Sequence, residues 1–233
     1  MLPLKDNVPT RAFPVLTVAL IVANVLVWIL YEDAGAGSGF VASVNEGAYQ
    51  PCEVDGSCEQ IGYGWPVNVF TSMFMHADWM HLIGNMLFLW IFGNNVEDTL
   101  GRVRFVVFYL LGGVVATALQ TVVTLGYASE RAGTVPNLGA SGAIAAVLGA
   151  YIVLHPGGTV LTWIAPIFIL PVPAVLYLGL WFVFQLVEGG SSFTHPEQGG
   201  GVAYFAHIGG FAFGFVAIKF FSAGRPRPLR PSY

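Results

Sequence analysis

Long apolar stretches are the feature that most limits what this chain can fold into. Crossing the hydrocarbon core of a membrane takes about 20 residues of helix, because backbone polar groups there must be satisfied within the segment. Only 9% of the residues are charged and 55% are hydrophobic. The sequence therefore predicts an all-α membrane protein with six transmembrane helices, at about residues 14–31, 80–96, 103–126, 137–154, 160–187 and 203–222.

The first apolar segment, 14–31, could also be read as a secretion signal. Its apolar run is too long, and no well-placed small-residue cleavage site follows it, which indicates an anchor that stays in the protein. No internal repeat or linker is visible, so residues 1–222 are expected to form a single membrane domain. Residues 223–233 are rich in proline and arginine and are expected to form a disordered cytoplasmic tail near anionic lipid.

Basic residues predict the orientation, because cytoplasmic loops hold an excess of lysine and arginine. Placing the N-terminus in the cytoplasm leaves only Arg131 on the opposite side. The predicted location is a multi-pass protein of the plasma membrane, with both termini in the cytoplasm. The residues that fall on the cytoplasmic side are Lys5, Arg11, Arg102, Arg104, Lys219, Arg225, Arg227 and Arg230.

Residues 32–79 then form a long extracytoplasmic first loop that contains no lysine or arginine. This loop holds both cysteines of the chain, Cys52 and Cys58. On an oxidising face they can close a disulfide bond, and two free thiols are the alternative. A zinc site is disfavoured, because two of the usual four ligands are missing.

Polar side chains inside membrane spans are costly and are therefore candidates for function. His81, Ser141 and His207 each lie near the start of a span that enters from the extracytoplasmic side. At 1.5 Å of rise per residue, all three fall at one depth, on the order of 7 Å below that interface. Asn85 lies one turn deeper than His81 on the same helical face.

Small residues predict close packing around Ser141 and His207. The spans 137–154 and 203–222 both carry glycine and alanine at helical spacing, and small faces let membrane helices approach closely. A serine beside a neutral imidazole is the arrangement of a nucleophile and its base. Taken alone, each residue also has a structural interpretation, as a packing or capping serine and as a hydrogen-bonded interior histidine.

Acyl transfer by this pair would need donors for the oxyanion. The backbone amides of Ala140 and Ser141 lie near a predicted helix N-terminus, where amides lack intrahelical acceptors. The side chains of His81 and Asn85 are further candidates. No Asp or Glu lies in the last span, so the sequence predicts a dyad whose histidine is oriented by helix packing and an aromatic neighbour.

Three motifs resemble those of the rhomboid intramembrane serine proteases: HADWMHLIGN at 76–85, GASGA at 139–143 and AHIGGFAFG at 206–214. The resemblance covers the six-span core and implies a rhomboid-like bundle that cleaves transmembrane protein substrates, within membrane lipid, near their outer ends. It implies Ser141 as nucleophile and His207 as general base and acid, with His81 and Asn85 assisting the oxyanion. We expect no cofactor, no metal and no nucleic-acid partner.

The chain departs from the pattern of this family at two places. Trp65 is followed by Pro66 where many members have arginine. Ala145 stands where many members have a tyrosine that stacks under the base, so another aromatic residue would have to take that place. Neither departure touches the dyad.

The resemblance also implies a lateral gate between the fifth and second spans. It would be formed by Trp181, Phe182 and Phe184 facing Phe88 or Trp90. Three other polar residues are expected to have structural roles. His76 would be a hydrogen-bonded loop residue, Gln185 would satisfy backbone groups freed by prolines, and His155 would be solvated at the cytoplasmic end.

Two other functions remain open at this point. A catalytically silent relative would recognise and escort membrane clients, although such proteins generally lose the serine or the histidine, and this chain has both. A metal or haem protein would use His76, His81 and His207, but their spacing matches no recognised site. Labelling by a serine-directed probe would distinguish a protease from a catalytically silent client-binding protein. Metal analysis of the purified protein would test the metal or haem alternative.

Overall fold

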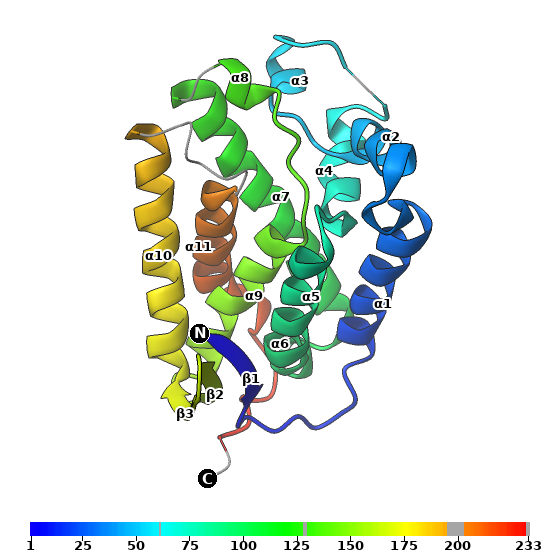
Figure 1. Cartoon of the computed structure of the whole chain (residues 1–233). Coiled ribbons are helices and arrows are strands. Elements are labelled where there is room, and N and C mark those ends of the chain that lie inside the picture. Colours follow the sequence, from blue (N-terminus) through cyan, green and yellow to red (C-terminus); the bar gives the residue numbers. More distant parts are fainter. Residues whose placement is uncertain (61, 128–129, 195–202, 232–233) are drawn as a thin grey trace.

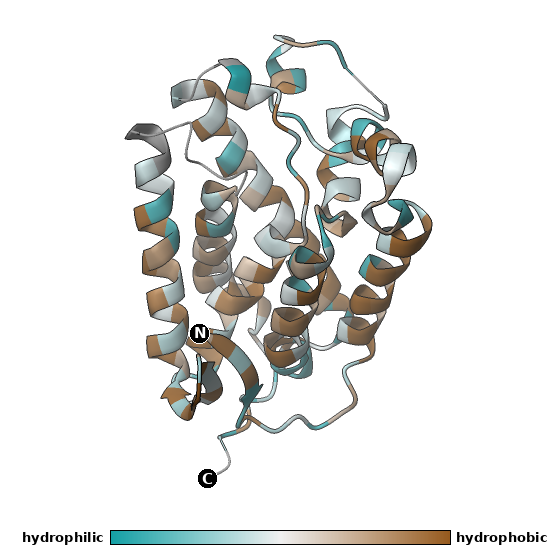
Figure 2. Ribbon diagram, viewed as in Figure 1, coloured by the Kyte–Doolittle hydropathy of each residue, from teal (hydrophilic) through white to brown (hydrophobic). Residues whose placement is uncertain are grey.

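The computed structural model describes residues 1–60, 62–127, 130–194 and 203–231 as a bundle of helices that run side by side (Figure 1). Both termini lie toward one end of the bundle, which we call the terminal face. The opposite end, the loop face, carries the short helices α2 (Gly37–Gly47), α3 (Cys52–Asp55) and α8 (Glu130–Gly133). Apolar residues are concentrated along the helices of the bundle (Figure 2).

Within the described residues, three helices are long and apolar enough to cross a membrane: α7 (Arg102–Tyr127), α10 (Ala174–Thr194) and α11 (Tyr204–Phe221). Two shorter apolar helices, α1 (Val15–Leu30) and α9 (Ser141–Leu154), lie beside them. Every residue of α9 from Gly142 to Tyr151 is buried. A helix that is surrounded by other helices does not have to match the lipid thickness itself, so α9 can be shorter than a lipid-facing span. Together these apolar helices make a mostly helical membrane protein.

The predicted span 80–96 is built from three consecutive elements. These are α5 (Trp79–Phe88), a π-helical turn η3 (Leu89–Gly93) and α6 (Asn94–Leu100). The junction residues Phe88, Leu89 and Asn94 all keep right-handed helical backbone angles. The three elements therefore form one unbroken helical rod with a widened turn in its middle.

Close contact between α9 and α11 occupies the centre of the bundle. A side chain added at Gly210 or Gly214 of α11 would overlap the carbonyl oxygen of Gly142 or Ala146 of α9. From the other side, Gly149 meets the backbone of Phe211. The two backbones thus touch along three turns, as the small residues of the two spans predict.

The predicted fifth span is wrong in its first half, and the fold is not all-α. Residues 160–173 form instead a hairpin of β2 (Thr159–Ile164), a turn at 165–167 and β3 (Phe168–Pro173), and α10 begins only at Ala174. Prolines 166, 171 and 173 explain this, because proline lacks the donor that a helix interior needs and favours an extended residue before it. Such prolines are tolerated on an edge strand, which is the place of β3.

The first residues of the chain complete this sheet. Strand β1 (Leu2–Asp6) pairs antiparallel with β2, which in turn pairs with β3. Asn7 extends the pairing with hydrogen bonds to and from Thr159, at 3.1 and 2.8 Å. The hydroxyl of Tyr151 donates to Asp6 at 2.7 Å. The N-terminal segment is thereby fixed to the connection between α9 and α10.

Charged residues at the terminal face cap a helix and form an ion pair. Glu97 accepts hydrogen bonds from the backbone amides of Leu16 and Thr17, at 3.0 and 2.7 Å, and so caps the N-terminus of α1. Asp98 pairs with Arg11 at 2.8 Å. These contacts join α6 to the start of α1.

The tail that is expected to be disordered makes hydrogen bonds to the terminal face. Arg225 donates to the carbonyl of Thr99 at 3.2 Å, and Arg11 donates to the carbonyl of Arg227 at 2.6 Å. Arg104 bonds the carbonyls of Phe221 and Ala223, at 2.9 and 2.8 Å. Arginine side chains thus hold the end of α11 and the tail against the terminal face, a set of long-range contacts that composition does not reveal.

His155 is also not solvated as predicted. Its side chain is 3% exposed, at the end of α9, with its ring 5.0 Å from that of Tyr151. Burial lowers the pKa of His155 to about 4. His195, in the last loop, lies outside the described residues.

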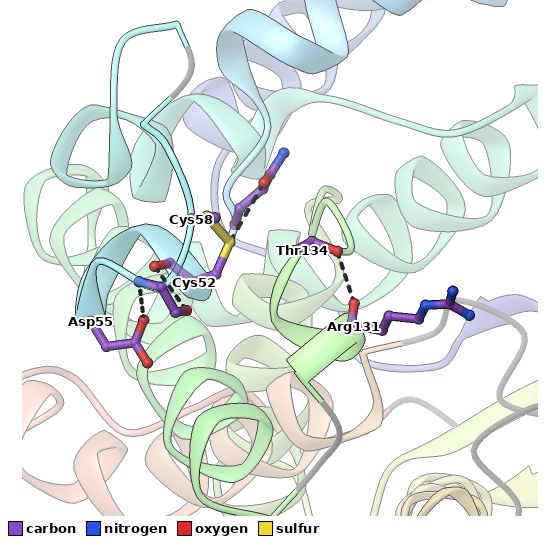
Figure 3. The surroundings of a disulfide bond; sticks show 7 residues. Cys52, Asp55, Cys58, Arg131 and Thr134 are labelled. Atoms are coloured by element: carbon purple, nitrogen blue, oxygen red, sulfur yellow. Dashed lines mark hydrogen bonds between the residues drawn. A yellow bond between two sulfur atoms is a disulfide. The ribbon is translucent and has the colours of Figure 1, made fainter.

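Of the two alternatives left open for Cys52 and Cys58, the structure has the disulfide bond (Figure 3). Cys52 is buried, and its Cβ atom lies 3.3 Å from the position that a Cβ on Gly133 of α8 would occupy. The bond therefore anchors the tip of the first long loop beside the end of α8.

Replacing both Cys52 and Cys58 with serine is expected to destabilise the protein by about 2 kcal/mol, the chain-entropy value for so short a closed loop. For a chain of this size that corresponds to a fall of about 4–8 °C in Tm, measured by thermal unfolding in detergent. Reducing the wild-type protein should produce the same fall. An unchanged Tm in both experiments would contradict a stabilising disulfide bond.

Candidate active site

Ser141 is the first residue of α9, and the two residues before it shape the turn that leads into the helix. Gly139 has φ +129°, a region that favours glycine, and its amide donates to the carbonyl of Ser72 at 2.9 Å. Ala140 then takes the N-cap position with helical backbone angles. The amides of the first turn, including that of Ser141, lack intrahelical acceptors.

His207 lies in the first turn of α11 and reaches the start of α9. Its Nε2 atom is 2.8 Å from Oγ of Ser141, a hydrogen bond between side chains that are 66 residues apart. The close approach of α9 and α11 at Gly142 and Gly210 makes this reach possible. The two residues therefore meet as the shared depth and the small faces predict.

The other ring nitrogen of His207 also has a partner. Nδ1 lies 2.7 Å from Oε1 of Gln185 on α10. The ring of Trp181, one turn earlier on α10, lies 5.7 Å from the imidazole at an angle of 38°. The predicted aromatic neighbour is thus Trp181, while the role expected for Gln185, satisfying backbone freed by prolines, is wrong.

A cleft of about 530 Å³ opens beside this pair. It is lined from α5 by His81, Gly84, Asn85 and Phe88, from α9 by Ser141 and Ala145, and from α10 and α11 by Trp181 and His207. The side-chain amide nitrogen of Asn85 is buried, and among the described residues it has no hydrogen-bond partner. Such an orphan donor at the wall of a cleft is available to a bound oxygen atom.

His81 presents its second nitrogen toward Ser141. Asp78 caps α5 by accepting from the amide of His81 at 2.8 Å, and Nδ1 of His81 accepts from the amide of Ala77 at 3.4 Å. The neutral ring then carries its proton on Nε2. A side chain on Gly139 would come within 2.9 Å of this Nε2 and 3.6 Å of the Ser141 oxygen, so both groups border one small space.

Ala140 is the one member of the predicted site that does not line the cleft. It is fully buried, whereas Ser141, His81 and Asn85 all border the cleft. A second cavity, of about 40 Å³, also borders Ser141 and is lined by Ser72, Gln120 and Asn137 among others. That space is large enough for water.

His76 lies buried in the loop, but the hydrogen bond predicted for its side chain is absent, since neither ring nitrogen has a partner among the described residues. It is fully buried, and its backbone amide donates to both carboxylate oxygens of Glu32 at 3.0 Å. Burial raises the pKa of Glu32 to about 7, and burial together with the neighbouring His81 lowers the pKa of His76 to about 3. His76 is therefore neutral at ordinary pH.

A metal site built on His76, His81 and His207 gains no support. Within residues 1–60, 62–127, 130–194 and 203–231, no three His, Cys, Asp or Glu side chains are grouped so that they could hold a metal ion. The rings of His76 and His81 pack edge to face at 5.1 Å.

The predicted gate residues are only partly where the resemblance implies. Phe182 stacks on Phe211 of α11 at 4.4 Å, and Phe184 is exposed on the bundle surface. Trp90 of η3 is also exposed. The aromatic contact between the α5 and α10 sides joins Phe88 to Tyr177, at 6.5 Å.

Sequence reasoning missed Gln185 as part of this site. The sequence feature that pointed to it is a side-chain amide among apolar residues in the predicted span 160–187. Its pairing with His207 could not be read from the sequence, because the register of α10 against α11 depends on where α10 begins. Shortening the predicted span 160–187 by the strands changes that register.

Comparison with known proteins shows which family this chain resembles. Residues 64–224 match the model of the Rhomboid domain. The chain is 31% identical over 152 residues to rhomboid protein 1, mitochondrial, of Saccharomyces cerevisiae, which covers 64% of this chain and 40% of that protein. It is 33% identical over 150 residues to presenilin-associated rhomboid-like protein A, mitochondrial, of Danio rerio, covering 64% and 36%.

A plant relative extends the match. RHOMBOID-like protein 12, mitochondrial, of Arabidopsis thaliana is 30% identical over 173 residues, which covers 68% of this chain and 47% of that protein. The chain thus spans less than half the length of these curated relatives. The matched region holds Ser141, His207, His81 and Asn85. The Rhomboid domain covers most of the chain, which therefore belongs to the rhomboid family.

Proposed function

We propose that this protein is an intramembrane serine endopeptidase that cleaves transmembrane protein substrates near the extracytoplasmic face of the membrane. The observation that carries the proposal is the 2.8 Å contact between Oγ of Ser141 and Nε2 of His207 at the wall of an open cleft. A serine and a histidine at this distance form a nucleophile with its base. Membership of the rhomboid family supports the same reaction.

The reaction proceeds through an acyl-enzyme. His207 takes the proton of Ser141 on Nε2 while the Ser141 oxygen bonds to the scissile carbonyl carbon, whose electrons move to its oxygen. The tetrahedral intermediate collapses, and the leaving amine takes the proton from Nε2. Water then repeats the sequence: His207 takes its proton, hydroxide adds to the acyl carbon, and the Ser141 oxygen leaves and recovers the proton.

The oxyanion is stabilised by donors that are already in place. We assign Nδ2 of Asn85, Nε2 of His81 and the backbone amide of Ser141, because the cleft brings these three residues together. The amide of Ala140 is the weakest of the predicted donors, since that residue is buried behind the cleft. Preorganised donors of this kind need no rearrangement as charge develops.

The membrane arrangement we propose has six spans in one domain, residues 1–222. The rod of α5, η3 and α6 and the shorter helices α1 and α9 complete the three long spans. The terminal face, with most of the basic residues, lies in the cytoplasm or an equivalent compartment. The disulfide bond of the loop face fits an oxidising exterior. The sequence predicts the plasma membrane, whereas the named relatives are mitochondrial, so we propose this orientation and assign no organelle.

Covalent labelling tests the proposed function. A fluorophosphonate probe should label the purified wild-type protein once, and peptide mapping should place the adduct on Ser141. The Ser141→Ala and His207→Ala variants should not be labelled, because the first lacks the nucleophile and the second lacks its base. Absence of labelling in a folded wild-type protein that still binds membrane clients would replace the proposal with the catalytically silent alternative.

Replacing Asn85 with alanine is expected to lower kcat for a transmembrane substrate by about 10²–10³-fold, the cost of one oxyanion donor. KM should change little, because the donor acts mainly on the transition state. Cleavage of a fluorogenic substrate in detergent measures both quantities. A fall in Tm of the same variant, with kcat per folded molecule unchanged, would assign Asn85 to folding instead.

A further inference from the structure

Gln185 is a buried amide on a helix that otherwise presents apolar residues to lipid. Its side chain is 4% exposed. Its neighbours Val183, Phe184, Leu186 and Val187 are all exposed hydrophobic residues. A polar group inside a membrane span costs free energy unless it is hydrogen-bonded, so the contacts of Gln185 indicate what it is for.

Those contacts fix which end of the amide faces His207. The nitrogen, Nε2, donates to the carbonyl of Trp181 one turn earlier, at 3.4 Å. The oxygen, Oε1, then faces Nδ1 of His207 at 2.7 Å and can only accept. This arrangement of the amide favours the tautomer of His207 that carries its ring proton on Nδ1.

The position of that proton decides what the other nitrogen can do. A neutral imidazole with its proton on Nδ1 has a free lone pair on Nε2, and this atom lies 2.8 Å from the Ser141 oxygen. The hydroxyl of Ser141 then donates to His207. This is the tautomer that a general base requires, whereas a proton on Nε2 would reverse the hydrogen bond.

Helix α9 offers His207 no aromatic support. Ala145, one turn after Ser141, is fully buried and has only a methyl group to place there. The aromatic contact comes from Trp181, and it belongs to α10, like Gln185. The orientation of the imidazole thus depends on α10 rather than on the helix that carries the nucleophile.

We propose that Gln185 is a positioning residue for His207: its carbonyl oxygen holds the Nδ1 proton and so fixes the ring orientation and tautomer that let Nε2 accept from Ser141. This inference rests on the proposed function and extends the dyad to a hydrogen-bonded chain of Ser141, His207 and Gln185 across α9, α11 and α10. In the same way, an orienting partner on the far nitrogen of a histidine commonly sets its tautomer.

The Gln185→Leu variant, which fills the same space without an acceptor, should lower kcat roughly 10- to 100-fold with KM changed less than about twofold. Gln185→Met, an unbranched replacement, should lower kcat by the same factor. This variant replaces Gln185→Leu in the test if the leucine variant folds poorly. Gln185→Glu keeps an acceptor oxygen at the same reach and should retain kcat within about fivefold of wild type. Val183→Ala, on the lipid-exposed side of α10, is the matched control and should leave kcat unchanged.

A spectroscopic measurement separates positioning from folding. In protein labelled with ¹⁵N-histidine, the His207 signals, assigned by their loss in His207→Ala, should show a proton on Nδ1 in the wild type and in Ser141→Ala. In Gln185→Leu the proton should be redistributed between the two nitrogens. This readout does not require cleavage, so it remains informative in an inactive variant.

The outcomes distinguish the inference from the proposed function. A wild-type protein that neither cleaves substrate nor labels at Ser141 overturns the proposed function. With an active wild type, the positioning role is overturned if Gln185→Leu and Gln185→Met keep kcat within about twofold. It is equally overturned if Gln185→Glu is as slow as Gln185→Leu, or if the tautomer of His207 does not change.

Discussion

Replacing Ser141 with alanine is expected to lower the cleavage of a transmembrane substrate by about 10⁴-fold or more, and replacing His207 with alanine should lower it by a similar factor. Each substitution removes one half of a pair that acts as a unit, at a hydrogen-bond distance of 2.8 Å. The double variant should therefore be no slower than either single variant. Product formation in detergent or in vesicles, followed by quantitative mass spectrometry, measures all three rates.

Two controls belong with this experiment. Ser43→Ala, in the loop-face helix α2, should keep full activity, because Ser43 bonds only the carbonyl of Phe40 among the contacts described. The Tm of Ser141→Ala should stay within about 2 °C of wild type, since a small residue replaces a small one. Cleavage by Ser141→Ala at more than one hundredth of the wild-type rate would refute the assignment of the nucleophile.

Replacing Gly214 with alanine should destabilise the protein by about 3 kcal/mol, in the upper part of the range for overpacking. A Cβ there would overlap the backbone of Ala146 and lie within 2.8 Å of its Cα atom, and a backbone cannot move aside as a flexible side chain can. The two helices at the centre of the bundle would have to separate. The corresponding fall in Tm is about 6–12 °C.

Gly179→Ala in α10 is the matched control, because an added Cβ there meets nothing within 4 Å. Its Tm should be equal to or slightly above that of the wild type, since alanine favours a helix more than glycine does. Thermal unfolding of the three proteins in one detergent makes the comparison. Equal Tm values for Gly214→Ala and wild type would mean that the contact between α9 and α11 is not tight.

Most of the helices could be predicted because membrane spans are long and apolar. Helices α1, α7, α9 and α11 begin and end within a few residues of the predicted segments. The pairing of Ser141 with His207 was equally accessible, since a shared depth and two faces of small residues leave few other arrangements. For Cys52 and Cys58 the sequence leaves a disulfide bond and two free thiols both open, and the structure has the bond.

The rest depended on contacts that hydropathy does not record. An apolar run reads alike whether it forms a helix or a strand, so residues 160–173 were assigned to the wrong class. The tail was predicted to be disordered because its composition is polar, although arginine side chains bind it to backbone carbonyls. Gln185 was misassigned because its partner lies on another helix, whose alignment requires coordinates.

The sheet at the terminal face joins residues from opposite parts of the chain, since Asn7 and Thr159 are 152 positions apart. At typical translation rates, about 8–30 s pass between the emergence of the first strand and that of its partner. During this interval β1 has no sheet to join, and helices α1, α5, α6, α7 and α9 are synthesised ahead of its partner strands. Closure of the sheet is therefore a late step in biogenesis, and a ribosome-stalled chain that ends at Leu154 would carry its N-terminal strand unpaired.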